Sequence, residues 1–341
     1  MLKPATSARL PTRLPDLGVV RVQGVDAVKF LQGQVSNDVT KLGAQVSVLA
    51  GLHNAQGRAI ALLRLVLAAD DEVIAILPRE LAGSVATRLA KFVLRAKAKV
   101  SDASLEWEIS GIEHVGAAGE TASAPVGATR RDEEGRLWVR VGTASARWLV
   151  VSHVDGAVHP APGVVSAANG GESAAAVRQA PTDIDAETSN ATSRSRDEWR
   201  ALDIADGLPQ VYAATSEAFV AQMLNLDVVG GIAFDKGCYT GQEVIARAHY
   251  RGKVKRRMQR FQVAGPVNLK PGDSGTLRDG RGFKVVDAVS TGDGRCEFLA
   301  VTTISANGAA GDDVAEDAAS ASSGVVVLDA DSLPLPYSLP A

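Results

Sequence analysis

The sequence predicts an α+β fold, and three observations support that prediction. In residues 1–159, runs rich in aliphatic and β-branched residues outnumber the helical stretches, and the two do not alternate as in a doubly wound sheet. Beyond residue 255, short β-runs separated by turns predict a small barrel or sandwich. The length of 341 residues, the hydrophobic content of 46% and the net charge of -3 describe an ordinary soluble chain with two or three domains.

The first half of the chain is expected to mix strands and helices. Leu81, Val85 and Leu89 recur at helical spacing, which predicts a helix over residues 79–95. Asn54 and Gly57 suit a tight hairpin between two β-rich runs. A second helix is expected at residues 26–34, and strands are expected at residues 19–23, 46–53, 58–67, 72–77, 98–101, 107–112, 137–141 and 147–151.

The composition changes after residue 159. Residues 160–195 are rich in Ala, Ser, Gly, Pro and Thr, and such a segment buries too little apolar surface to order itself. We therefore expect a disordered insertion there. The core is expected to resume over residues 196–254, with a helix that begins at Arg196 and ends near Gly207 and Pro209, because Gly and Pro are helix stop signals. Residues 255–341 form the C-terminal module, with a flexible acidic loop at 305–324 and strands at 260–263, 275–277, 282–289, 298–304 and 325–328.

The sequence argues against several classes of site. Cys238 and Cys296 are the only cysteines and form no CxxC or Cys/His cluster, so we expect neither a disulfide framework nor a metal site. The chain has no run of about 18 apolar residues and no signal peptide, so we expect a cytoplasmic protein without a membrane span. Motifs typical of nucleotide hydrolysis, dinucleotide redox chemistry, serine hydrolases and zinc proteases do not occur.

Residues 234–252, with the sequence FDKGCYTGQEVIARAHYRG, carry the strongest chemical signal. Thr240 and Glu243 have the spacing of a capping box, which predicts a helix over residues 244–250. Cys238 would then lie before the positive end of the helix dipole and near Lys236, and both influences favour a thiolate. Cys238 and Lys236 are therefore candidate catalytic residues, although a lone cysteine is more commonly a small buried hydrophobe.

Other residues are candidates for ligand contact. Trp199 lies in a strongly charged helix and either packs against the core or stacks on a flat heteroaromatic ligand, with Arg200 beside it to bind an anionic group. Gln242 has no part in starting the helix. Residues 247–260 are basic without any acid, so they form either an exposed solvated face or a patch for RNA phosphates or a poly-carboxylate tail.

These segments together resemble the YgfZ-type folate-binding family, relatives of the T-protein (aminomethyltransferase) of the glycine cleavage system. The resemblance rests on residues 30–34 with Asn37-Asp38, the hairpin at 54–57, residues 201–209, Asn225-Leu226 and, above all, KGCYTGQE at 236–243. It implies a GcvT-like folate-binding α+β core in residues 1–159 and 196–254, followed by a β-barrel. It further implies a role in assembling or repairing iron–sulfur clusters in client proteins, including enzymes that thiolate tRNA.

The resemblance also implies the ligand and its contacts. The cofactor would be tetrahydrofolate or a folate derivative, with a transient iron–sulfur cluster near Cys238. Its binding residues would be Trp199, Arg200, Asn225, Tyr239, Gln242 and Arg247.

Two departures from the T-protein bear on activity. Residues 59–63 contain no acid where the T-protein carries its catalytic Asp, so ordinary aminomethyl transfer is not expected. Ala205 stands where relatives tend to carry Glu, with Asp206 one position later. Three functions are weighed: a tetrahydrofolate-binding accessory factor for iron–sulfur clusters in which Cys238 faces the folate, a folate-dependent one-carbon transferase, and an RNA-binding module.

Overall fold

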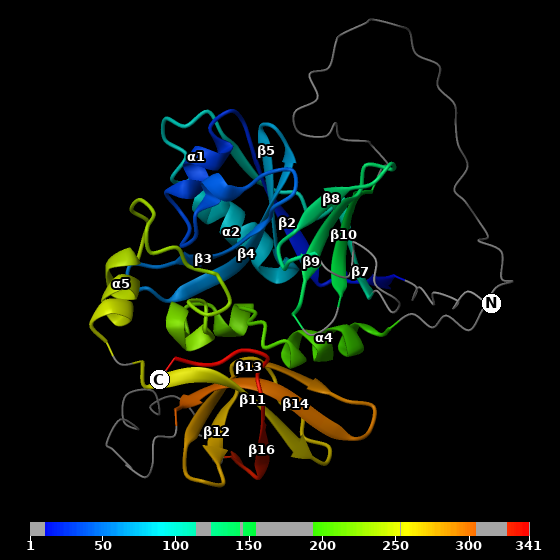
Figure 1. Cartoon of the computed structure of the whole chain (residues 1–341), viewed down its shortest axis with the longest axis vertical. Coiled ribbons are helices and arrows are strands. Elements are labelled where there is room, and N and C mark those ends of the chain that lie inside the picture. Colours follow the sequence, from blue (N-terminus) through cyan, green and yellow to red (C-terminus); the bar gives the residue numbers. More distant parts are fainter. Residues whose placement is uncertain are drawn as a thin grey trace, which may run out of the picture.

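The structure is a computed structural model that describes residues 11–113, 124–143, 146–154, 194–252, 254–304 and 326–340. Within these residues the strands form three sheets, of which the third is the C-terminal one at the bottom of Figure 1. Mixed sheets with few helices confirm the α+β class. The expected insertion at 160–195 lies almost wholly outside the described residues, and the expected acidic loop at 305–324 lies entirely outside them.

The first sheet is antiparallel, with the strand order β3-β4-β5-β2-β6. Its elements are β2 (Leu17–Gln23), α1 (Ala27–Gln32), η1 (Val39–Lys41), β3 (Val48–His53), β4 (Ala59–Ala69), β5 (Glu72–Pro78), α2 (Arg79–Ala90) and β6 (Lys99–Asp102). The predicted hairpin joins β3 to β4, and α2 packs against β2 and β6. That helix ends at Ala90, before the predicted residue 95, because Phe92 and Leu94 are not buried and stand 49% and 85% exposed.

The second sheet packs against the opposite face of the first. It has the order β1-β7-β10-β9-β8, built from β1 (Thr12–Arg13), β7 (Trp107–Glu113), β8 (Thr129–Arg131), β9 (Leu137–Val141) and β10 (Arg147–His153). Leu63 and Leu65 of β4 belong to the core beneath α1 and α2, whereas Val66 and Ala68 belong to the core shared with β7, β9 and β10. Burial on both faces explains why residues 59–69 are almost continuously apolar.

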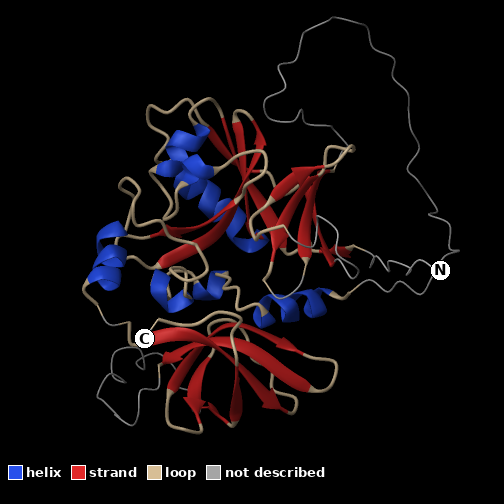
Figure 2. Ribbon diagram, in the orientation of Figure 1, coloured by secondary structure: helices blue, strands red, loops and turns tan. Residues whose placement is uncertain are grey.

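The C-terminal sheet is a nearly closed, six-stranded barrel. Its order is β15-β12-β13-β14-β11-β16, from β11 (Arg256–Ala264), β12 (Ser274–Leu277), β13 (Gly282–Ser290), β14 (Arg295–Thr303), β15 (Val326–Leu328) and β16 (Ala330–Leu333). Phe261, Phe283 and Phe298 pack their rings together inside it, and Cys296 is buried among them. The predicted C-terminal barrel is therefore confirmed (Figure 2).

Helix α4 (Arg196–Ala205) lies between the second sheet and the barrel, where Figure 1 draws it in green. Ser195 and Glu198 form a capping box at its start, so this helix begins where the sequence predicts. It contacts β1 on one side and β13 and β14 on the other. None of the described helices is both long and apolar enough to cross a membrane.

Candidate functional site

A cavity of about 120 Å³ lies where the first two sheets, α4 and the barrel meet. Apolar side chains of both sheets line it, together with polar or charged groups from Asp16, from β4, from α4 and the segment after it, and from β13 of the barrel. Its lining includes Asp16, Leu49, Leu62, Arg64, Ile76, Val141, Leu149, Trp199, Arg200, Asp203, Leu208, Gln210, Tyr212 and Asp287. We call it the central cavity.

Arg200 lines the central cavity, but its charge is already compensated. Its Nε donates to Asp287 Oδ1 at 2.6 Å, and a second guanidinium nitrogen contacts the same carboxylate. The Tyr212 hydroxyl donates to Asp287 Oδ2 at 3.0 Å. Burial lowers the pKa of Arg200, yet the adjacent Asp287 carboxylate outweighs that effect and the net shift is upward. Arg200 therefore joins α4 to the barrel, in place of the anion-binding role expected from the sequence.

Trp199 also lines this cavity, and only 4% of its surface is exposed. A side chain at Gly111 would collide with the indole ring, so the strand backbone lies directly against it. The Arg147 guanidinium lies 5.0 Å from the ring centroid. Trp199 thus belongs to the core of the second sheet, which is the first of its two expected fates. It offers a ligand a wall and not a free stacking platform.

Asp206 does not line the central cavity. It is 2% exposed, contacts the Arg147 guanidinium and accepts a hydrogen bond from Thr143 N at 3.0 Å. Arg147, fully buried, also donates to Asp203 at 2.7 Å. Burial lowers the pKa of Arg147, but Asp203 and Asp206 raise it by a larger amount. The net shift is upward, so the guanidinium remains charged. Asp206 therefore does not supply a ligand contact in place of the residue at Ala205.

Arg64 is the cavity residue that sequence reasoning overlooked. It lies on β4 two positions after Leu62, and because alternate residues of a strand share a face, both side chains line the cavity. Burial lowers the pKa of Arg64 to about 10, with Asp203 offsetting part of this shift and Arg147 adding to it. The sequence did carry a signal, since Arg64 is the one charge in the apolar run at 59–69.

A second, more open cavity of about 710 Å³ adjoins the central one. Both are lined by Leu49, Arg64 and Leu208, so these residues stand at their common wall. Other residues around this outer cavity include Asn37, Lys41, Ser47, Asp235 and Tyr250. The apolar walls of the central cavity together with a cation at the shared wall fit a flat ring system that carries an acidic group.

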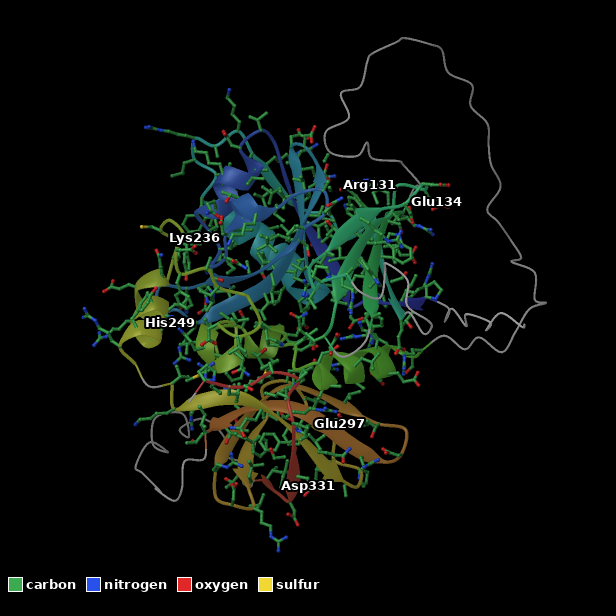
Figure 3. All side chains as sticks on the ribbon, in the orientation of Figure 1. Arg131, Glu134, Lys236, His249, Glu297 and Asp331 are labelled. Carbon is green, nitrogen blue, oxygen red and sulfur yellow. The ribbon has the colours of Figure 1, made fainter. Side chains whose placement is uncertain are left out.

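The loop before α5 (Gln242–Tyr250) is fixed by Lys236, which Figure 3 labels. Its Nζ donates to the backbone carbonyls of Gln32, Val35 and Asn37 at 2.7, 2.6 and 2.9 Å. Burial lowers the pKa of Lys236 to about 8. Gln242 Nε2 donates to the Lys236 carbonyl at 3.4 Å, which closes the loop on itself.

The predicted capping box at Thr240 and Glu243 is wrong. The helix begins after Gly241, which has a φ of 84°, and no side chain caps it. A side chain at Gly241 would collide with the Asn54 carbonyl oxygen of the β3–β4 turn, so this position requires glycine. Tyr239 is buried, and its ring centroid lies 5.1 Å from Lys236 Nζ. It also lies 6.4 Å from the ring of the buried His53.

Cys238 is exposed and lines neither cavity, whereas Cys296 is buried in the barrel. Among the described residues, no group of three or more His, Cys, Asp or Glu side chains is arranged to hold a metal ion. A single surface thiol does not fit a resident iron–sulfur cluster. The expectation that Cys238 faces the central ligand is likewise not met by this geometry.

The two remaining expected ligand residues also lie outside both cavities. Asn225 is fully buried with a φ of 56°, and its Nδ2 donates to the Met258 carbonyl at 2.8 Å. Arg247 is exposed on α5. The basic run does not form one surface, because Arg257 is buried in a bidentate ion pair with Asp227.

No protein-family model matches this chain. Among solved structures, it is similar to the glycine cleavage system aminomethyltransferase T from Bartonella henselae, with a TM-score of 0.62 and 12% sequence identity over 87% of this chain and 79% of that chain. This chain has the fold of that aminomethyltransferase. It also matches a heterotetrameric sarcosine oxidase from Corynebacterium sp. U-96 with a TM-score of 0.32, 15% identity and coverage of 46% of this chain and 82% of that chain.

The aminomethyltransferase fold confirms the GcvT-like architecture expected from the sequence. Within it, β4 turns Leu62 and Arg64 toward the central cavity, and residues 59–63 supply no acid there. Two of the acids that line the cavity, Asp203 and Asp287, are bound to arginines. Arg64 on β4 therefore gives the site a positive charge, whereas the carboxylates of Asp203 and Asp287 already form ion pairs with arginines.

Proposed function

We propose that this protein binds a reduced folate in the central cavity and supports the assembly or repair of iron–sulfur clusters in client enzymes. The observation that carries the folate proposal is the cavity itself, at the meeting point of two sheets, α4 and barrel in an aminomethyltransferase fold. Leu62, Val141 and Leu149 give it apolar walls that exclude water from a flat ring, and Arg64 provides charge for an acidic group.

Aminomethyl transfer is disfavoured by the state of the carboxylates. Proton transfer at a ligand nitrogen calls for a carboxyl group within hydrogen-bond reach that is not committed elsewhere. Asp203 is held by Arg147, and Asp287 by Arg200 and Tyr212. Asp16 also lines the cavity, but its side chain is 46% exposed and lies 3.9 Å from the Arg196 guanidinium. An accessory role therefore suits the cavity better than a transferase.

The surface position of Cys238 suits contact with another protein. The loop that carries it is fixed by Lys236 and Gln242, so the thiol is presented at a defined place. Because Cys238 lines neither cavity, folate and client would use different parts of the protein. RNA binding is less favoured, since Arg257 is committed to Asp227 and interrupts the basic surface.

The test separates the two halves of this proposal. Calorimetric titration with 5-formyltetrahydrofolate should show saturable binding to wild-type protein and to Cys238→Ser alike. In a strain lacking the gene, Cys238→Ser should fail to restore iron–sulfur enzyme activity, whereas Cys296→Ala, which alters the buried thiol, should restore it. Absence of folate binding would refute the first half. Full restoration by Cys238→Ser would refute the second.

A further inference from the structure

Arg64 is a half-buried cation without a partner. No hydrogen bond or ion pair to its side chain occurs in the part of the chain that the structure describes, and its guanidinium region borders both cavities. Asp203, the acid whose charge partly offsets the burial of Arg64, accepts a hydrogen bond from Arg147. Removing a cation from water without a partner is costly, so such a group is retained where a ligand completes it.

The buried arginines of this fold show how unusual that is. Arg147 is held by Asp203 and Asp206, and Arg257 by Asp227. Arg140 donates to the carbonyl of Gly142 at 2.9 Å. Each of these side chains holds parts of the protein together. Arg64 makes no such contact among the described residues, and it lines both cavities.

We propose that Arg64 binds the glutamate carboxylate of the folate, so that the ring system lies in the central cavity and further glutamates follow the outer cavity. This rests on the proposed folate binding and assigns its orientation. A guanidinium matches a carboxylate through two parallel hydrogen bonds, which a surface lysine does not reproduce. Lys41 also lines the outer cavity and supplies a second cation for a longer tail.

The decisive variant is Arg64→Met, which keeps the length of the side chain and removes its charge. Charge-assisted hydrogen bonds contribute enough that we expect affinity for 5-formyltetrahydrofolate to fall about tenfold or more. Affinity for 6-methyltetrahydropterin, which lacks the carboxylates, should not change. Arg247→Met is the matched control, because Arg247 is exposed on α5 outside both cavities, and it should bind folate as wild type does.

Polyglutamates test the direction of the tail. Wild-type protein should bind the triglutamate of 5-formyltetrahydrofolate more tightly than the monoglutamate, and Lys41→Met should reduce that difference without altering monoglutamate affinity. An equal affinity for the two forms in wild type would overturn the path through the outer cavity.

A stability measurement distinguishes ligand binding from a structural role. Because the cation of Arg64 makes no hydrogen bond or ion pair among the described residues, the melting temperature of Arg64→Met without ligand should equal or exceed that of wild type. Arg64→Lys retains a charge without the planar fork, so it should fold and bind folate with intermediate affinity.

The possible negative results of these binding and melting experiments lead to different conclusions. If wild type binds folate and Arg64→Met binds it equally well, the assignment of Arg64 is wrong and the proposed function stands. If wild type does not bind folate, both fail. If Arg64→Met loses pterin and folate binding together, or melts well below wild type, Arg64 acts on the ring or the fold and the tail assignment is overturned.

Discussion

Arg200 of α4 and Asp287 of β13 bind each other across the boundary between the core and the barrel, with 2.6 Å between Nε and Oδ1. The Asp287 side chain is only 3% exposed, and Tyr212 donates a further hydrogen bond to it. All three residues line the central cavity. This contact between the core and the barrel is therefore also part of the cavity wall.

Arg200→Met should destabilise the protein because it leaves the Asp287 carboxylate buried without its cation. Breaking one side of a buried pair costs about 3–5 kcal/mol. Chemical denaturation followed by circular dichroism would measure the loss. The double variant Arg200→Met with Asp287→Asn should recover part of it, since no charge then remains buried. A loss below about 1 kcal/mol in the single variant, typical of exposed pairs, would contradict this assignment.

Lys236→Met should loosen the loop that carries Cys238. The variant leaves the carbonyls of Gln32, Val35 and Asn37 without their shared donor, and losing hydrogen bonds of this kind costs about 1–3 kcal/mol. Hydrogen exchange should increase at residues 32–37 and 236–242, with Lys29→Met, which alters a neighbouring lysine on α1, as the control. Unchanged exchange in both segments would show that the three contacts do not hold the loop.

Lys236 should make the stability of the protein depend on pH in the alkaline range. Burial lowers its pKa from 10.5 to about 8, so between these values the unfolded chain binds more protons than the folded one. Stability from this group therefore rises as pH increases from about 8 to 10.5. Comparing denaturation of wild type and Lys236→Met across that range isolates the contribution. If the difference between the two proteins stays constant with pH, the shift is absent.

His53 should make the protein sensitive to acid. Burial lowers the pKa of this histidine from 6.5 to about 4, so the folded state keeps it neutral while the unfolded state protonates. Its contribution to stability is present above pH 6.5 and declines as pH falls toward 4, by up to about 3 kcal/mol. Thermal denaturation should show a shallower acid dependence for His53→Phe than for wild type. Parallel curves would refute this role.

The two cysteines should differ sharply toward a thiol reagent. Cys238 is exposed, whereas Cys296 is buried and its burial raises the pKa of the thiol. Titration with a chromogenic disulfide should therefore detect one thiol in the folded protein and two in denaturant. Folded Cys238→Ser should release almost no colour. Two fast-reacting thiols in the folded wild type would contradict the burial of Cys296.

Much of the fold could be predicted from local sequence. The hairpin at Asn54 to Gly57, the strand runs and the start of α4 follow from turn chemistry, alternation and capping. The end of α2 was missed because Phe92 continues the helical spacing of Leu81, Val85 and Leu89, yet this side chain is 49% exposed and packs into no core.

The site was harder to predict because its partners lie far apart in the chain. Asp287, which forms an ion pair with Arg200, is 87 residues away in the sequence, so the sequence around Arg200 did not indicate this partner. The capping box failed for a similar reason, since Gly241 is set by its contact with the distant Asn54 carbonyl. Arg64 alone left a local trace, as a charge within a buried strand, but only the structure shows that it faces two cavities.

The burial of Cys296 restricts what oxidation can do to this protein. Cys238 is the only other sulfhydryl in the sequence, and Cys296 is 1% exposed inside the barrel, so the two cannot pair while the barrel is folded. Every disulfide that Cys238 forms must therefore be intermolecular, to a small thiol, a second copy or a client. The partner found in a disulfide with Cys238 would therefore identify a molecule that contacts this part of the surface.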